Sequence, residues 1–205
     1  MSATDDLRQR VGDLLKEHGR TFADEAGVRL RDTPGPLYQL LVVCVVSSIR
    51  IRANIAVAAA RELFAAGYRS PTQMRKATWQ QRVDALGRAH YKRYDESTAT
   101  ALGDGAQLIL DRWHGDLRKL RAEAGHDPRR IRELLQEVPR IGPVGAEIFC
   151  REAQSLWPEL RPTFDKRATQ GAAKAGLPTD PRELAALVAD EDLPRLAAAL
   201  VRATL

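Results

Sequence analysis

Cysteine is scarce in this 205-residue chain, which contains only Cys44 and Cys150. No pair or quartet of cysteines or histidines has the spacing of metal ligands, so we expect neither a zinc nor an iron–sulfur site. We also expect no disulfide framework, which fits a reducing compartment. Cys44 lies within the apolar run LLVVCVV, and this position indicates a buried thiol.

The chain also lacks a long apolar segment. Its longest apolar run, Leu40 to Val46, is far shorter than the roughly 20 residues that cross a bilayer. The N-terminal residues MSATDDLRQR lack the apolar core of a signal peptide. We therefore expect no membrane partner and a cytoplasmic protein, associated with the nucleoid if it binds DNA.

Runs of β-branched residues are short, whereas Ala and Leu are abundant, and this composition favours an all-α protein. Lys and Arg number 32 against 27 Asp and Glu, which gives a formal net charge of +5. Most of these cations are Arg, whose planar fork suits phosphate. The excess is modest, and many basic proteins bind no nucleic acid.

Apolar spacing and capping residues predict a series of helices. Leu7, Val11 and Leu14 recur at helical spacing and indicate a helix that ends near Gly19 or shortly after. The breaker Thr33-Pro34-Gly35-Pro36 marks a boundary, and PLYQLLVVCVVSS after it indicates a fully buried helix, with a buried strand as the alternative. Later helices are expected at 53–67 with Gly67 as its cap, from Pro71, at 78–87, from Tyr94 to Gly115, and from Pro128.

The segment from Ile131 to Gly176 is the most informative. A helix is expected to end near Glu137, a short VPRIG turn follows, and a second helix begins near Pro143. The start of such a helix presents free backbone N–H groups and a positive dipole, so a DNA phosphate can dock there. An ordinary helix–turn–helix corner is the alternative interpretation of the same pattern.

Three segments in this order resemble the helix-hairpin-helix glycosylase superfamily, of which endonuclease III is a member. VPRIGPVGAE resembles the hairpin of that superfamily, and PTFDKRATQGAAKAGL resembles the segment that carries its catalytic aspartate. LYQLLVVCVVSSIRIRANIAVAAARELF resembles its first buried helix and the region that follows. The resemblance extends from about Pro36 to the C-terminus.

The resemblance implies an all-α fold with two helical domains. It places a six-helix barrel at 36–153, with the helix-hairpin-helix motif at about 131–153, and a second domain at 1–35 plus 154–205. It also implies double-stranded DNA as the partner. Nothing in the sequence demands a dimer, so we expect a monomer. The iron–sulfur segment of the superfamily has no counterpart here, and we expect no cofactor.

By position, Asp165 matches the catalytic aspartate of the superfamily. A carboxylate there can stabilise the positive charge that develops on the sugar, or activate water. Thr163 is a plausible helix cap that would place Asp165 at a helix N-terminus. The alternative is that Asp165 is itself only an N-cap.

The hairpin and the region after the first buried helix depart from the superfamily pattern. Val144 occupies the position of the lyase lysine, so the amine needed for a Schiff base is missing. Arg140 replaces a turn glycine, which predicts either an altered turn or an added phosphate contact. Ile49 replaces a glutamine that helps to fill the space left by a flipped base. A helix surface is the plainer interpretation of Ile49.

The sequence therefore predicts two groups of site residues besides Asp165. The hairpin residues expected to bind DNA are Arg140, Ile141, Gly142, Val144 and Gly145. The candidate wedge or pocket residues are Ile49, Arg50, Tyr91 and Tyr94, although a partly buried tyrosine pair between solvated charges is at least as good an interpretation of the two tyrosines. The three tryptophans, Trp79, Trp113 and Trp157, are expected in the core or at domain contacts.

The function that this pattern predicts is monofunctional DNA glycosylase activity, in which Asp165 assists loss of a damaged or mispaired base. One alternative is a non-catalytic DNA-binding protein of the same fold. A second is an abasic-site lyase or endonuclease that uses another amine. A third, from a different class, is a helical protein–protein adaptor.

Overall fold

The structure is a computed structural model that describes residues 3–204. Every regular element in this range is helical, as the composition predicts, and none of its helices is long and apolar enough to cross a membrane. The chain divides into two compact units, Ala23–Phe149 and Met1–Phe22 with Cys150–Leu205. Each unit is described separately below.

These compact units do not have the bounds of the predicted domains, which change after residue 35 and after residue 153. The larger unit also includes Ala23, Ala26 and Val28, whose side chains are buried. Two helices, α2 (Phe22–Glu25) and α10 (Pro143–Ala153), each continue from one unit into the other. The predicted division into folding domains remains a prediction.

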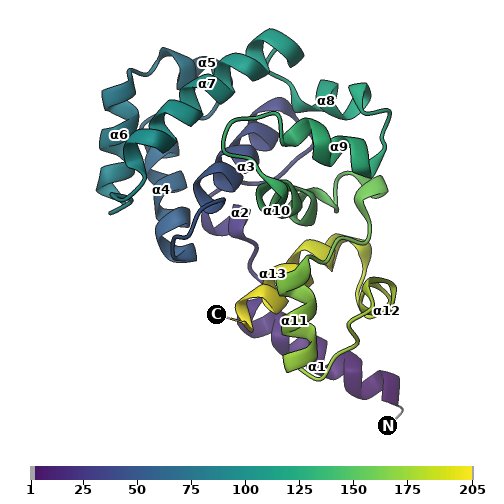
Figure 1. The fold of residues 1–205 in the computed structure, drawn as a ribbon. Helices are drawn as coiled ribbons and strands as arrows, with labels where there is room; N and C mark the ends of the chain where they lie inside the picture. The colour runs from purple at the N-terminus through teal and green to yellow at the C-terminus, as the bar shows by residue number, and fades with distance from the viewer. Residues whose placement is uncertain (1–2, 205) are drawn as a thin grey trace. The chain divides into compact units, whose positions relative to one another are not determined.

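The larger unit is built around the helix that the apolar run predicts (Figure 1). In α3 (Pro34–Ser47) the side chains from Leu40 to Val46 are all buried, so the run forms a central helix and not a strand. The helices around it are α4 (Ala53–Ala65), α5 (Pro71–Lys76), α6 (Trp79–Arg88), α7 (Asp95–Trp113), α8 (Leu117–Glu123) and α9 (Pro128–Leu135). Among these, α4, α7 and α8 contact α3 directly.

The start of α3 corrects one expectation. The sequence predicts that Thr33–Pro36 interrupts the helical structure. Instead, α3 begins at Pro34 and contains both prolines in its first turn. The first N–H groups of a helix have no intrahelical acceptor, so proline removes no hydrogen bond there. The segment therefore starts a helix.

Helix caps lie close to where the sequence places them. After α4, Gly67 has a φ of 93°, and the N–H of Tyr68 donates to Leu63 O at 3.0 Å. This pattern is a Schellman motif. Thr78 and Gln81 form the expected capping box at the start of α6. Helix α8 was not predicted. It follows α7, which is terminated by His114 in the left-handed conformation, with a φ of 52°.

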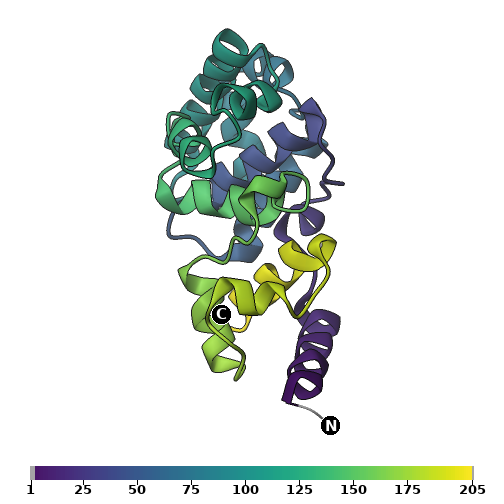
Figure 2. The same cartoon turned by 90° about the vertical axis from the view of Figure 1, so that its right-hand side faces the viewer.

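The smaller unit pairs segments from the two ends of the chain. Its helices are α1 (Ala3–His18), η1 (Pro158–Leu160), α11 (Lys166–Lys174), α12 (Pro181–Ala185), η2 (Asp190–Asp192) and α13 (Leu193–Arg202). Helix α13 packs on both α1 and α11 (Figures 1 and 2). A Cβ atom on Gly171 would lie 1.8 Å from Leu200 O, so the close approach of α11 to α13 requires glycine.

Candidate nucleic-acid interface

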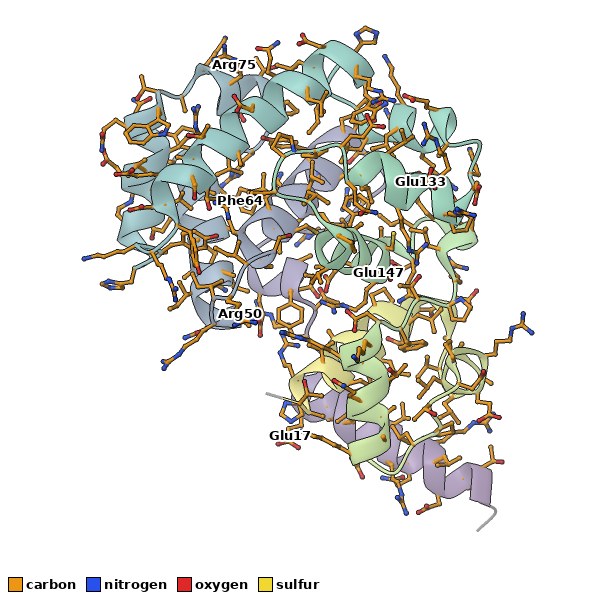
Figure 3. The ribbon with its side chains drawn as sticks, in the orientation of Figure 1. Glu17, Arg50, Phe64, Arg75, Glu133 and Glu147 are labelled. Carbon is orange, nitrogen blue, oxygen red and sulfur yellow. The ribbon has the colours of Figure 1, made fainter. Side chains whose placement is uncertain are left out.

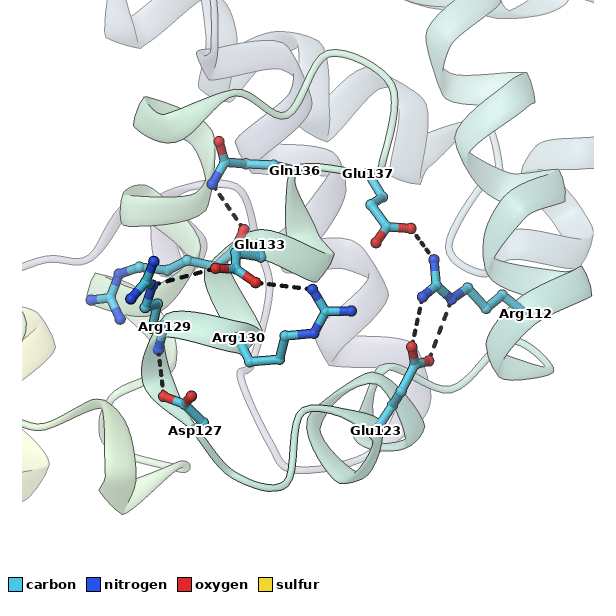
Figure 4. Close-up of polar contacts among 9 residues, drawn as sticks. Arg112, Glu123, Asp127, Arg129, Arg130, Glu133, Gln136 and Glu137 are labelled. Atoms are coloured by element: carbon cyan, nitrogen blue, oxygen red, sulfur yellow. Dashed lines mark hydrogen bonds and ion pairs between the residues drawn. The ribbon is translucent and has the colours of Figure 1, made fainter.

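Helix α9, the first helix of the hairpin, is held by its cap and by ion pairs. Asp127 caps it by accepting the N–H of Arg129 at 3.0 Å. Arg112 of α7 pairs with Glu123 at 2.6 Å and also with Glu137, just beyond the end of α9 (Figure 4). These contacts fix the residues that lead into the turn.

A further ion pair joins the two helices of the hairpin. Arg132 Nε of α9 lies 2.5 Å from Glu147 Oε1 of α10, and both side chains are partly buried. Glu147 is labelled on α10 in Figure 3. The turn between the helices is thus closed on one side by a charged pair and cannot open without breaking it.

The turn itself is a tight four-residue turn. The N–H of Ile141 donates to Val138 O at 3.0 Å, with Pro139 and Arg140 in the central positions. Arg140 has a φ of 73°, so the turn has the features of a type II turn, with proline first and a positive φ second. Arg140 therefore adopts the left-handed conformation, which is unfavourable for a residue with a Cβ atom.

The side chain of Arg140 is anchored within the larger unit. Its Nη2 donates to Ser97 Oγ, and its guanidinium lies 5.9 Å from the centroid of the Tyr94 ring. The ring of Tyr94 also faces the guanidinium of Arg93 at 5.2 Å. The hairpin turn and the start of α7 thus share a cluster of two cations around one aromatic ring.

The remaining predicted hairpin residues divide into exposed and buried groups. Val144 is 63% exposed, and a Cβ on Gly142 would meet no atom within 4 Å. By contrast, Ile141 is buried, and a Cβ on Gly145 would lie 2.4 Å from Ser48 Oγ. Gly145 therefore lets α10 approach the end of α3, and its lack of a side chain does not open the surface.

The start of α10 has the features of an anion site. Pro143 is its first residue, so the first backbone N–H groups of the helix belong to Val144 and Gly145. In an α-helix these N–H groups have no intrahelical acceptor, and the helix dipole makes this end positive. Gly142 and Val144 at the surface leave the approach open to a phosphate oxygen.

The predicted wedge residues Ile49 and Arg50 lie in the loop between α3 and α4, and not on a helix surface. The N–H of Ile51 donates to Ile49 O at 2.8 Å, which places Arg50 at the centre of a three-residue turn. Arg50 is exposed at this turn (Figure 3), whereas Ile49 is half-buried. A role for either residue as a wedge stays a prediction.

The two predicted pocket tyrosines have different surroundings. Tyr91 is fully buried, and its hydroxyl donates to Val46 O at 3.1 Å. Burial raises the pKa of the Tyr91 phenol. Tyr91 therefore presents no surface to a ligand in this structure, and its position agrees with a buried tyrosine better than with a pocket residue. Tyr94 is partly exposed and precedes α7.

Of the three tryptophans, which are expected in the core or at domain contacts, Trp79 is the one that does not lie in the core. Trp113 and Trp157 are buried, but Trp79 is 41% exposed at the first position of α6. Its indole N–H donates to Thr100 Oγ1 at 3.0 Å, which fixes the ring against α7. Trp79 and Tyr94 line the same hollow of about 570 Å³.

Asp165 lies in the smaller unit as the N-cap of α11. Its Oδ1 accepts the N–H of Ala168 at 2.9 Å, and its Oδ2 accepts Arg151 Nη1 at 2.6 Å. The side chains of Asp165 and Arg151 are 14% and 4% exposed. Thr163, the predicted cap, is buried and donates its hydroxyl to Leu160 O. The carboxylate is therefore fixed through both oxygens.

Two residues that the sequence pattern did not indicate, Arg151 and Gln154, position this segment. Arg151 holds Asp165, and the buried amide of Gln154 exchanges two 2.9 Å hydrogen bonds with the backbone of Thr163. Arg151 lies in the last turn of α10, and Gln154 directly follows that helix. Charged and amide residues among the apolar side chains of that segment were the available signal.

The structure thus brings together some of the predicted residues. The hairpin residues, Tyr94 and the loop at Ile49 and Arg50 all belong to the larger unit, whereas Asp165 belongs to the smaller one. Among residues 3–204, no three His, Cys, Asp or Glu side chains are grouped in a way that could hold a metal ion.

Comparison with known proteins gives a likeness of fold. No family model and no curated protein sequence matches the chain. The endonuclease III chain of a trapped endonuclease III–DNA covalent intermediate, an estranged-adenine complex, matches with a TM-score of 0.57 and 13% identity. The endonuclease III chain of a non-covalent endonuclease III–DNA complex matches with a TM-score of 0.57 and 14% identity. Each match covers 98% of this chain and 85% of the other.

Proposed function

We propose that this chain, which has the endonuclease III fold, binds duplex DNA and hydrolyses the N-glycosidic bond of a damaged or mispaired base. The fold match supports this proposal because it extends over nearly the whole chain and because the matched endonuclease III chains are in complexes with DNA. The local geometry supports it at two places, the hairpin and Asp165.

The hairpin supplies the DNA contact. The first N–H groups of α10 can bind a backbone phosphate without any base being read. Arg140 adds a cation at the preceding turn, and Gly142 leaves the approach open. Such contacts depend strongly on salt, because each neutralised phosphate releases counterions.

Asp165 supplies the chemistry. Cleavage of a glycosidic bond builds positive charge on the sugar, and a fixed carboxylate stabilises that charge or orients the attacking water. Val144, which the sequence resemblance aligns with the lyase lysine, offers no amine, so hydrolysis by water is the reaction that fits. The observation that carries the proposal is the fixed and partly exposed Asp165 carboxylate, held by Arg151 and Ala168.

The same observation also favours a second candidate, a DNA-binding protein without chemistry. Both oxygens of Asp165 already accept hydrogen bonds, and the buried guanidinium of Arg151 offsets the charge of the carboxylate. A neutralised carboxylate stabilises a developing cation less than a free one does. In this candidate function Asp165 serves α11 only, and the hairpin still binds phosphate.

The first prediction is that Asp165→Asn abolishes base release and spares DNA binding. Labelled duplexes with damaged bases, mismatches or an abasic site are incubated with the protein and resolved on gels with and without alkali. We expect alkali-dependent cleavage of one duplex by the native protein and a loss of about 100-fold or more in the variant. Binding to the same duplex, measured by anisotropy, should be unchanged.

Asp180→Asn is the matched control for this experiment. Asp180 also caps a helix, by accepting the N–H groups of Arg182 and Glu183, but that helix is α12, and Asp180 has no hydrogen bond to Arg151 or α11. Base release that survives Asp165→Asn excludes a role for this carboxylate in catalysis. Salt-sensitive duplex binding with no release from any substrate favours the second candidate. Covalent trapping on abasic DNA by borohydride would instead indicate a lyase.

A further inference from the structure

We propose that the hollow between α6 and α7 binds single-stranded nucleic acid, with an unpaired base stacked on Trp79. The hollow has a volume of about 570 Å³ and is lined by Trp79, Lys92, Arg93, Tyr94, Asp95, Glu96, Ser97 and Thr100. This function goes beyond the proposed function, because duplex binding by the hairpin and base release at Asp165 do not require it.

Trp79 provides the stacking surface. Tryptophan is the largest apolar side chain and is costly to leave in water, yet this one is 41% exposed. Its ring is fixed, because the indole N–H donates to Thr100 Oγ1. A fixed and exposed aromatic ring offers a face to any base without sequence preference.

The hollow also carries two exposed cations that can contact the phosphates of a nucleic-acid backbone. Lys92 and Arg93 are exposed on its rim, and the Arg93 guanidinium lies over the Tyr94 ring. The carboxylates of Asp95 and Glu96 are in the first turn of α7, where negative charge stabilises the helix N-terminus. Exposed cations beside aromatic rings are typical of sites that follow a single strand.

Arg140 connects the hollow to the hairpin. It donates to Ser97, which lines the hollow, while its own backbone forms the hairpin turn. A strand whose phosphate docks at the hairpin thus meets the aromatic hollow through one side chain. This continuity favours a nucleic acid over a protein as the occupant.

The occupant must be unpaired. Inside a duplex, each base is stacked on both faces by its neighbours, so it cannot offer a free face to Trp79. An unpaired base has two free faces, and its stacking on tryptophan does not depend on hydrogen bonds to base edges. Single-stranded DNA and RNA share this chemistry, so both are included in the test.

The test uses the tryptophan itself. Trp113 and Trp157 are buried, so quenching of the exposed Trp79 can be separated from their fluorescence. The native protein is titrated with an oligothymidylate and an oligouridylate of about 12 nucleotides and with an abasic DNA oligomer of the same length. We expect saturable quenching by the oligothymidylate, the oligouridylate or both. Binding of the abasic oligomer, which lacks bases, should be at least about tenfold weaker.

Variants then locate the binding, with labelled oligonucleotides and anisotropy as the readout. Trp79→Ala and Arg93→Ala should each weaken binding about tenfold, whereas Trp79→Phe, which keeps a ring, should retain most of the affinity. Arg129→Ala is the matched control, because Arg129 is an exposed arginine on α9 outside the hollow. Circular dichroism confirms that each variant is folded.

Two results overturn the proposal: equal binding of the abasic oligomer, or binding that survives Trp79→Ala and Arg93→Ala. The proposed function is tested separately, by anisotropy with a blunt duplex and by base release. Loss of duplex binding with intact quenching by single strands removes the proposed function and leaves this inference. The reverse pattern removes this inference alone.

Discussion

Arg140 has a backbone conformation that residues with a Cβ atom adopt rarely. At a φ of 73°, its Cβ lies close to its own carbonyl group, which costs about 1–2 kcal/mol relative to ordinary conformations. Residues held in such regions tend to occur at functional sites, where the surroundings fix them. Here the side chain contacts Ser97 and Tyr94, and both contacts would be lost with the glycine that relieves the strain.

We predict that Arg140→Gly is more stable than Arg140→Ala by about 1 kcal/mol. Both substitutions remove the same side-chain contacts, but only glycine removes the left-handed strain. Urea unfolding of the two variants measures the difference in the free energy of unfolding. Equal stability of the two variants would show that position 140 is not left-handed in solution.

Asp165 is joined to Arg151 by an ion pair that water reaches poorly. Breaking a buried ion pair by removing one partner typically costs about 3–5 kcal/mol, because the other charge is left without compensation. Asp165 is slightly exposed, so the cost here should lie near the lower value. The pair links the end of α10 to the start of α11.

We predict that Arg151→Met and Asp165→Asn are coupled. Each single variant should lower the free energy of unfolding, and the double variant should be about 2 kcal/mol more stable than the sum of the two losses indicates. The matched control is the exposed pair Arg88 and Glu62, whose coupling in the same cycle should be below about 1 kcal/mol. Additive losses at Arg151 and Asp165 would argue against the ion pair.

Among the helices, α7 contains two glycines that weaken its intrinsic helical tendency. Gly103 has a packing reason, because a Cβ there would lie 2.6 Å from Nη2 of Arg82. Arg82 is buried and donates to the carbonyl oxygens of Met74, Ala77 and Ala99. Burial lowers the pKa of its guanidinium, but these acceptors still hold it as a cation between three segments.

We predict that Gly103→Ala destabilises the protein by about 1–3 kcal/mol, although alanine is the better helix former. The added methyl group displaces Arg82 from its carbonyl acceptors, which are then left buried without a donor. Gly87→Ala in α6 is the control, because its Cβ would meet no atom within 4 Å, and it should be neutral or slightly stabilising. Thermal unfolding of both variants measures the contrast.

The helices could largely be predicted from local signals. The apolar run of α3, the glycine after α4 and the capping box of α6 are each set by neighbours in sequence. Helix α8 was missed because only three residues, His114, Gly115 and Asp116, separate it from α7, the first two in the left-handed conformation. The sequence His114-Gly115 is equally typical of a helix end that is followed by a loop and of a short break between two helices.

The site was less predictable, because its contacts join residues far apart in sequence. Arg140 contacts Ser97 at a separation of 43 residues, and Arg151 contacts Asp165 at 14. The sequence predicts Asp165 near a helix start and leaves open whether Thr163 or Asp165 is the cap; Asp165 is the N-cap of α11. The sequence also could not show that Tyr91 is buried and Trp79 exposed, since side-chain burial depends on how the helices pack.

At the scale of the whole molecule, an endonuclease III fold arises here with only 13% sequence identity to a matched chain. What is common to both is the arrangement of helices, which depends on apolar spacing and caps more than on particular residues. Arg140 and Val144, two of the residues that depart from the pattern the sequence resembles, lie in the hairpin turn and at the start of α10. The fold alone therefore does not determine the function.

The pairing of α1 with α13 affects how the chain folds during synthesis. Arg202 donates to His18 O across a separation of 184 residues, so α1 leaves the ribosome well before α13, the helix on which it packs. At about 5–20 residues per second, this interval lasts roughly 10–40 s. Throughout that time the face of α1 that packs on α13 is not yet covered by that helix.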